Sequence, residues 1–201
     1  MLAKGRARLA RQHLRARRPK PIPARSYVFL LDCSASMIER GALARAKGLL
    51  LVWLRAVRRQ AERAALICYG GAQADVRFGP AIPSGWNERW IDPIGGGGGT
   101  PLALGVQIAS ELALRKHRQN GGLGSTFSGR SSGVVDTQKI LLVLTDGRTR
   151  EAPQRPEGFQ YIVIVDFETQ SPALHRCEQL AQRWDAQYVH ITALFEDGFA
   201  V

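Results

Sequence analysis

The sequence predicts a doubly wound α/β domain, a three-layer sandwich whose sheet is mostly parallel with one antiparallel edge strand. From Ser26 onward, short β-branched or apolar runs alternate with longer stretches of helical periodicity, as in a sheet with crossover helices. Two of the runs, KILLVLTD and FQYIVIVD, are apolar almost throughout, which is typical of strands buried on both faces. With 201 residues and 45% hydrophobic content, the chain is long enough for one well-packed domain.

The first half of the chain predicts a strand, a helix and a hairpin. SYVFLLD (26–32) is the first strand, and a helix follows it to about Glu62. Apolar residues recur there at spacings of three and four: Leu43, Ala46, Leu50, Trp53 and Val57. AALICYG (64–70) and ADVRFG (74–79) are two strands around a short turn, and they form the hairpin that supplies the antiparallel edge.

The second half predicts two more helices alternating with three strands. A helix begins near Pro101 and extends over 101–118, with proline in its first turn. KILLVLTD (139–146) and FQYIVIVD (159–166) are strands, SPALHRCEQLAQRW (171–184) is a helix, and AQYVHI (186–191) is the last strand. The resulting order is βαββαβαβ.

One segment has a composition that does not favour packing. Nine of the fourteen residues from Asn120 to Gly133 are Gly or Ser, so 120–137 is predicted to be a flexible loop joining a helix to a strand. Two interpretations stay open for it. It is either a tolerated surface insertion or a loop that grips a partner beside the functional face.

The net charge of +11 is concentrated at the N-terminus. Residues 1–25 contain nine of the 28 Lys/Arg and no acid, so they are predicted to be a basic arm, while 26–201 form the nearly neutral domain. A nucleic-acid-binding face on the domain is therefore not expected. The arm is a solvated segment, a docking element for an acidic partner, a phosphate-binding arm or an Arg-rich presequence.

Three cysteines, Cys33, Cys68 and Cys177, stand at long spacings without a zinc pattern, which favours reduced thiols in a cytosol-like compartment. No secretory signal follows the first charges. The longest apolar run in the first helix, LLLVWL, has six residues, whereas a membrane span needs about 20. We therefore expect a cytoplasmic protein without membrane contact.

Five oxygen-bearing side chains occur where the carboxyl ends of parallel strands meet, which is where open α/β sheets bind ligands. They are Asp32, Ser34, Ser36, Thr100 and Asp146. Hard oxygen donors favour Mg²⁺, with Mn²⁺ or Ca²⁺ as alternatives, over zinc or copper. The pattern leaves a coordination position for a carboxylate from another protein. An alternative without a metal is that Ser36 only caps the following helix.

Two other kinds of site are disfavoured by the same residues. GGGGGTPLALG is glycine-rich before a helix, but the chain has no Gly-Lys-Ser/Thr and hence no lysine to reach a phosphate. DCSAS is not a nucleophile elbow, and no histidine is placed beside it for a serine nucleophile. Metal-assisted hydrolysis stays a minor alternative because no general base is evident near the site.

The three motifs DCSAS, GGTPL and LTDGR resemble the metal-ion-dependent adhesion site of von Willebrand factor A (VWA) domains. That family combines Asp-x-Ser-x-Ser, a threonine on a second loop and an aspartate on a third, in this order. The resemblance implies a Rossmann-like VWA fold. It also implies that the five residues named above hold the metal, some of them through water.

Further runs resemble the VWA domain at the C-terminal end of the D-type polypeptide of magnesium chelatase and its cobaltochelatase relatives. They are VFLLDCSASM, ARAKGLL, GGGGTPLALGV and LLVLTDGR, with the basic run KGRARLARQHLRARR before them, so the resemblance covers about residues 4–165. The D-type polypeptide also carries an ATPase-like module and an acidic linker, which have no match here. We therefore expect no ATP hydrolysis and no catalysis by the chain itself.

The resemblance implies a stand-alone adaptor subunit in an ATP-driven metal-chelatase complex of tetrapyrrole biosynthesis. Its Mg²⁺ would accept a carboxylate from an AAA+ ATPase subunit, from the large chelatase subunit, or from both. The alternative function is a protein-binding module for another AAA+ ATPase unrelated to tetrapyrroles. The inserted metal, the tetrapyrrole and the oligomeric state stay open.

Overall fold

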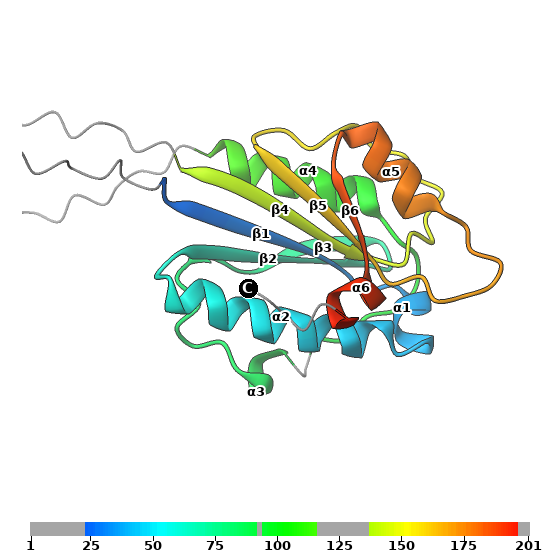
Figure 1. Ribbon diagram of the computed structural model, residues 1–201, viewed down its shortest axis with the longest axis horizontal. Coiled ribbons are helices and arrows are strands. Elements are labelled where there is room, and N and C mark those ends of the chain that lie inside the picture. The colour runs from blue at the N-terminus through cyan, green and yellow to red at the C-terminus, as the bar shows by residue number, and fades with distance from the viewer. Residues whose placement is uncertain (1–22, 92–93, 116–136, 197–201) are drawn as a thin grey trace, which may run out of the picture.

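The computed structural model describes residues 23–91, 94–115 and 137–196. Its central layer is a six-stranded sheet with the order β3-β2-β1-β4-β5-β6 (Figure 1). All neighbouring strands pair in parallel except β2 and β3, which form the predicted antiparallel hairpin. The predicted fold class is therefore confirmed. The basic arm (1–25) and the Gly/Ser loop (120–137) lie outside the described residues, apart from 23–25 and 137.

The strands closely follow the apolar runs of the sequence. They are β1 Arg25–Asp32, β2 Arg63–Gly70, β3 Gln73–Ala81, β4 Gln138–Thr145, β5 Tyr161–Asp166 and β6 Gln187–His190. Alternate residues of β1 face two different cores, because side chains along a strand point to opposite faces. Phe29 and Leu31 pack with one core, whereas Val28 and Leu30 pack with the other. Burial on both faces explains why the central residues of β1 are all apolar.

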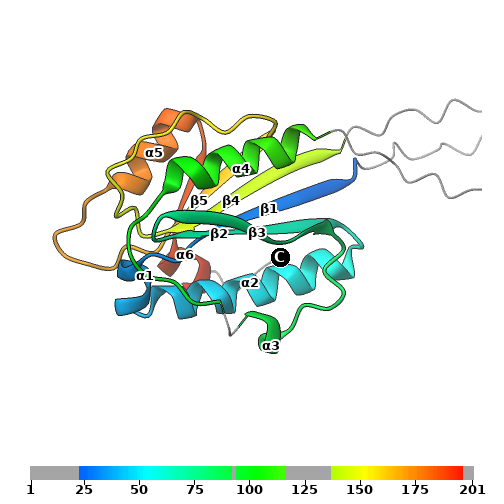
Figure 2. The same ribbon diagram turned by 180° about the vertical axis from the view of Figure 1, so that it is seen from behind.

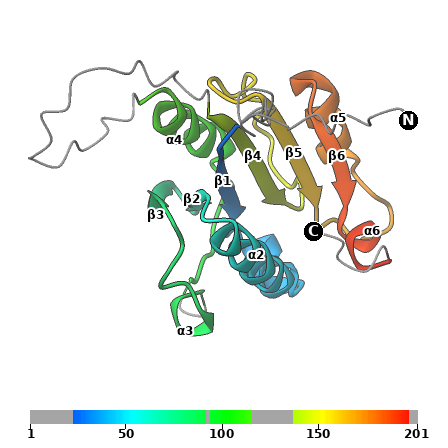
Figure 3. The same cartoon turned by 60° about the vertical axis from the view of Figure 1, so that its left-hand side comes forward.

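Helices cover both faces of the sheet. They are α1 Ala35–Glu39, α2 Ala42–Arg59, α3 Glu88–Ile91, α4 Leu102–Leu114, α5 Arg176–Trp184 and α6 Ile191–Glu196. Figures 1 and 2 show α2 along one face and α4 with α5 along the other, and Figure 3 shows the three layers at an angle. The stripe on α2 that includes Leu43, Ala46 and Leu50 is buried as predicted. None of the described helices is long and apolar enough to cross a membrane.

The prediction of a single helix between β1 and β2 is wrong. Two helices, α1 and α2, are separated at Gly41, whose φ of +66° lies in the left-handed region that favours glycine. Gly41 also donates its N–H to the carbonyl of Ile38, which ends α1. The chain therefore turns before the long helix starts, and the residues that follow Asp32 form a short element of their own.

The predicted helix over 171–184 is wrong at its start. The helix α5 begins at Arg176, because His175 has a φ of +54° and the preceding segment folds back on a carboxylate. The N–H groups of Leu174 and His175 are donated to Glu168 Oε2 at 2.9 and 3.2 Å. A side chain six or seven residues upstream thus competes successfully with helix formation.

The three cysteines belong to the core. Cys33, Cys68 and Cys177 are all buried, and none forms a disulfide. Burial raises the pKa of the Cys177 thiol well above its usual range, which keeps it protonated at neutral pH.

Candidate metal centre

The turn after β1 is fixed by the first acid of the candidate site. Asp32 is fully buried, and its Oδ1 accepts the backbone N–H of Ser34 at 2.9 Å. The hydroxyl oxygens of Ser34 and Ser36 lie 3.2 Å apart. Ser34 is the residue that precedes α1, and its side chain makes no capping hydrogen bond, while Ser36 lies inside the helix. The alternative that Ser36 caps the helix is therefore wrong, and neither hydroxyl is used on the α1 backbone N–H groups.

The glycine run packs directly against this turn. Gly97 donates its N–H to the carbonyl of Cys33 at 2.8 Å, and Ala35 donates to the carbonyl of Gly98 at 3.2 Å. A Cβ on Gly96 would lie 1.8 Å from the Cys33 carbonyl oxygen, a distance at which no side chain fits. The run is glycine-rich because two backbone segments approach closely here, and this needs no bound phosphate as its explanation.

Thr100 follows the glycine run and contacts the loop after β4. Its Oγ1 donates to the carbonyl of Arg148 at 3.4 Å, a long hydrogen bond. In return, the hydroxyl of Thr149 donates to the carbonyl of Thr100 at 3.1 Å. Thr100 is only half-buried. These contacts hold the second and third loops of the candidate site against each other.

Asp146 contributes a carboxylate oxygen that has no partner. Its Oδ1 accepts the N–H of Arg148 at 3.1 Å, whereas its Oδ2 is buried and makes no hydrogen bond to any described residue. The whole residue is 2% exposed. An unpaired buried carboxylate oxygen is costly, so a ligand at this position would offset the cost.

Two buried carboxylates face the same region of the fold. Burial raises the pKa of Asp32, the hydrogen bonds from Thr145 and Ser34 lower it in part, and the nearby charge of Asp146 raises it further. A divalent cation between the two acids would reverse this effect by favouring both ionised forms. The side chains present therefore fit a hard cation.

The candidate site depends on hydroxyl groups as much as on acids. Within 23–91, 94–115 and 137–196, no group of three or more His, Cys, Asp or Glu side chains is placed to hold a metal ion. Ser34, Ser36 and Thr100 would add neutral oxygens to the two carboxylates of such a site. Such a donor set suits Mg²⁺, which accepts water and hydroxyl ligands beside one or two carboxylates.

Thr145 links the two acids but was not among the residues predicted from the sequence. Its hydroxyl donates to Asp32 Oδ2 at 2.6 Å and accepts the N–H of Gly147 at 3.1 Å. Thr145 is 1% exposed. The sequence did contain a signal for this residue: a hydroxyl directly precedes Asp146 at the end of an otherwise apolar strand.

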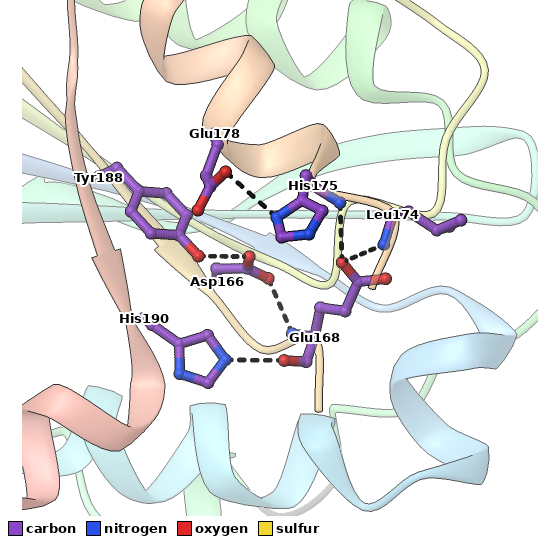
Figure 4. Close-up of polar contacts among 7 residues, drawn as sticks. All are labelled: Asp166, Glu168, Leu174, His175, Glu178, Tyr188 and His190. Atoms are coloured by element: carbon purple, nitrogen blue, oxygen red, sulfur yellow. Dashed lines mark hydrogen bonds and ion pairs between the residues drawn. The ribbon is translucent and has the colours of Figure 1, made fainter. Parts of the chain in front are cut away.

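A second polar cluster, also missed, lies at the end of β5 (Figure 4). Asp166 accepts the N–H of Glu168 at 2.7 Å on one oxygen and the hydroxyl of Tyr188 at 2.9 Å on the other. His190 Nε2 lies 2.7 Å from the carbonyl oxygen of Glu168, which can only accept, so this nitrogen carries the proton. These bonds tie β5 to β6 and position the Glu168 carboxylate under the loop that precedes α5.

No protein-family model matches the chain. It is 27% identical over 178 residues to the magnesium-chelatase 60 kDa subunit of Rhodobacter capsulatus, covering 86% of this chain and 31% of that protein. It is 29% identical over 122 residues to the magnesium-chelatase 67 kDa subunit of Chlorobaculum parvum, covering 61% of this chain and 17% of that protein. An uncharacterized protein of Mycobacterium tuberculosis is 26% identical over 182 residues, covering 85% and 27%. The chain thus spans less than a third of the length of these relatives.

The solved structures that match the chain have low sequence identity to it and TM-scores below 0.5. Proximal thread matrix protein 1 from the mussel byssus gives a TM-score of 0.48 at 15% identity, covering 87% of this chain and 44% of that one. A von Willebrand factor type A structure from Catenulispora acidiphila gives 0.46 at 15% identity, covering 87% and 41%. The resemblance to magnesium-chelatase subunits is confirmed by the curated relatives, and the sheet has the architecture that a VWA domain implies: the chain is a distant relative of magnesium-chelatase subunits.

Proposed function

We propose that this chain is a VWA-type adaptor that binds a carboxylate of a partner protein through a Mg²⁺ site, as a non-catalytic part of an ATP-driven metal chelatase. The observation that carries the proposal is the buried, unpaired Oδ2 of Asp146 next to the Asp32 turn. Mn²⁺ and Ca²⁺ are the alternative ions, because they accept the same oxygen donors.

The hydrogen bonds that the five residues already make indicate which of them could bind Mg²⁺ directly. Asp146 Oδ2 and the serine hydroxyls are the groups available as direct ligands, whereas both oxygens of Asp32 already accept hydrogen bonds. Asp32 would contribute charge, directly or through water, and Thr100 would complete the set from the second loop. Bound Mg²⁺ would supply an electrophilic position for one further carboxylate.

The proposed partner proteins are inferred from the similarity of this chain to magnesium-chelatase subunits. Magnesium-chelatase subunits of 60 and 67 kDa are much longer than this chain, which matches 31% and 17% of them. We propose that the chain supplies their VWA function to a separate AAA+ ATPase subunit, to the large chelatase subunit, or to both. It would couple the ATPase to insertion of a divalent metal into a tetrapyrrole.

Calorimetric titration with Mg²⁺ tests the metal site. Asp146→Ala and Ser36→Ala should each weaken Mg²⁺ binding by about tenfold or more, because each removes one donor group. Asp75→Ala is the matched control, since it removes a half-exposed carboxylate that pairs with Arg77 on β3. Equal affinities in all four proteins would remove the metal proposal.

Co-purification with a purified chelatase ATPase subunit and large subunit tests the adaptor role. Capture should occur with Mg²⁺, be lost with EDTA, and be lost in Asp146→Ala. Metal binding without capture of either subunit would leave a metal site but overturn the chelatase assignment. A purified AAA+ ATPase unrelated to chelatases, offered in a parallel experiment and captured when neither chelatase subunit is, would support the alternative function.

A further inference from the structure

A cavity of about 410 Å³ lies between α4, α5 and the loop after β4. Its lining includes Thr145 and Gly147, the residues on either side of Asp146. Three arginines also line it, Arg150, Arg176 and Arg183, against one carboxylate, that of Glu151. Its volume falls in the range of about 300–1,000 Å³ that ligand sites occupy. The cavity is therefore a basic pocket that shares its wall with the candidate metal site.

The positive charges of this pocket are not balanced by the protein. None of the three arginines forms an ion pair with a carboxylate in the described ranges, where the ion pairs involve other residues. Arg176 Nη1 donates to the carbonyl of Thr149 at 2.6 Å, which holds its guanidinium against the loop after β4. Arg150 and Arg183 are exposed, and their guanidinium groups make no hydrogen bond to the described residues. Several N–H donors are thus available for an anion.

The carboxylate of Glu151 forms part of the wall of the pocket. Glu151 Oε2 accepts the N–H of Ala103 at 2.6 Å, in the first turn of α4. The first N–H groups of a helix carry partial positive charge, so the wall attracts anions independently of the arginines. Glu151 shows that a carboxylate fits there, and it can neutralise only one of the three guanidinium charges.

We propose that this pocket binds an acidic side chain of the same partner that supplies a carboxylate to the metal site. The partner identity rests on the proposed function, and the anion preference rests on the arginines. Guanidinium groups bind carboxylates through paired N–H bonds, which gives geometric selectivity as well as charge. Because Thr145, Asp146 and Gly147 are consecutive, a short acidic segment can reach both places. The domain would then recognise two acidic residues of one segment.

A blocked tetraglutamate peptide, titrated into the full chain in EDTA at low salt, tests the pocket without the metal. The wild type should bind it, and Arg150→Gln/Arg183→Gln should weaken binding by about tenfold or more, since one hydrogen bond to a charged group is worth about that factor. Arg58→Gln/Arg59→Gln, at the exposed C-terminal end of α2, is the matched control and should bind as the wild type does. Melting curves should coincide for all three.

Equal weakening in both double variants would show nonspecific attraction and overturn the proposal. Inorganic phosphate that binds more tightly than the peptide, and is lost with the same two arginines, would assign the pocket to phosphate and overturn it as well. If peptide binding persists while Mg²⁺ binding is absent in the wild type, only the proposed metal function fails.

Discussion

The hydroxyl of Thr145 donates to the carboxylate of Asp32 at 2.6 Å, a bond between neighbouring strands that joins residues 113 positions apart in the sequence. Both residues are buried, at 1% and 0% exposed. The bond satisfies one oxygen of the first acid, and Thr145 directly precedes the second, so it sets the relative position of the two carboxylates.

Thr145→Val should destabilise the fold by about 1–3 kcal/mol, because it leaves the buried Asp32 oxygen and the Gly147 N–H without this partner. Losing the hydrogen bond should also raise the pKa of Asp32 further and weaken Mg²⁺ binding. Chemical denaturation and calorimetry measure the two effects. Thr145→Ser keeps the donor and should restore both, and a valine variant as stable as the wild type would contradict the prediction.

Gly96→Ala should destabilise the chain by about 1–3 kcal/mol, as overpacking of a close contact does, because the added Cβ would lie 1.8 Å from the Cys33 carbonyl oxygen. Gly48→Ala provides the contrast, since its Cβ would meet nothing within 4 Å in the middle of α2. That variant should gain about 0.5–1 kcal/mol from helix propensity. Urea denaturation would refute the account if both alanines acted in the same direction.

Asp166→Asn should reduce the pH dependence of stability. Burial is the main cause that raises the pKa of Asp166 above its ordinary 3.8. The folded state then binds this proton more tightly than the unfolded state, so the contribution of Asp166 to stability falls as the pH rises from about that value. Denaturation midpoints from pH 4 upward should fall more steeply in the wild type than in Asp166→Asn. Parallel slopes would show that Asp166 does not titrate abnormally.

Glu168→Ala should release the segment before α5. The amides of Leu174 and His175 both donate to Glu168 Oε2, so their hydrogen exchange should accelerate by about tenfold or more, whereas amides of β1 and β4 should keep their protection. Glu178→Ala is the control, because the Glu178 carboxylate contacts the side chain of His175 and neither of the two amides. Unchanged exchange at both amides in Glu168→Ala would mean that the carboxylate does not hold the segment.

The strands, the hairpin and the approximate helix positions were predictable because their signals are local. A run such as KILLVLTD has to be buried on both faces, and Gly71 between two apolar runs indicates a turn. Local signals failed where a distant or unusual backbone contact decided the outcome. Gly41 takes a left-handed conformation that separates α1 from α2, and Glu168 holds the residues that were expected to start α5.

The sequence by itself determined which segments form strands, the mostly parallel class of the sheet and the candidate oxygen donors, because apolar periodicity and residue chemistry are properties of short segments. The tertiary structure alone decided that Thr145 bonds to Asp32, that one oxygen of Asp146 is left unpaired, and that three arginines line one pocket beside it. These relationships join residues from different strands and helices. They depend on the strand order and on the packing of α4 and α5 over the sheet, which no local pattern specifies.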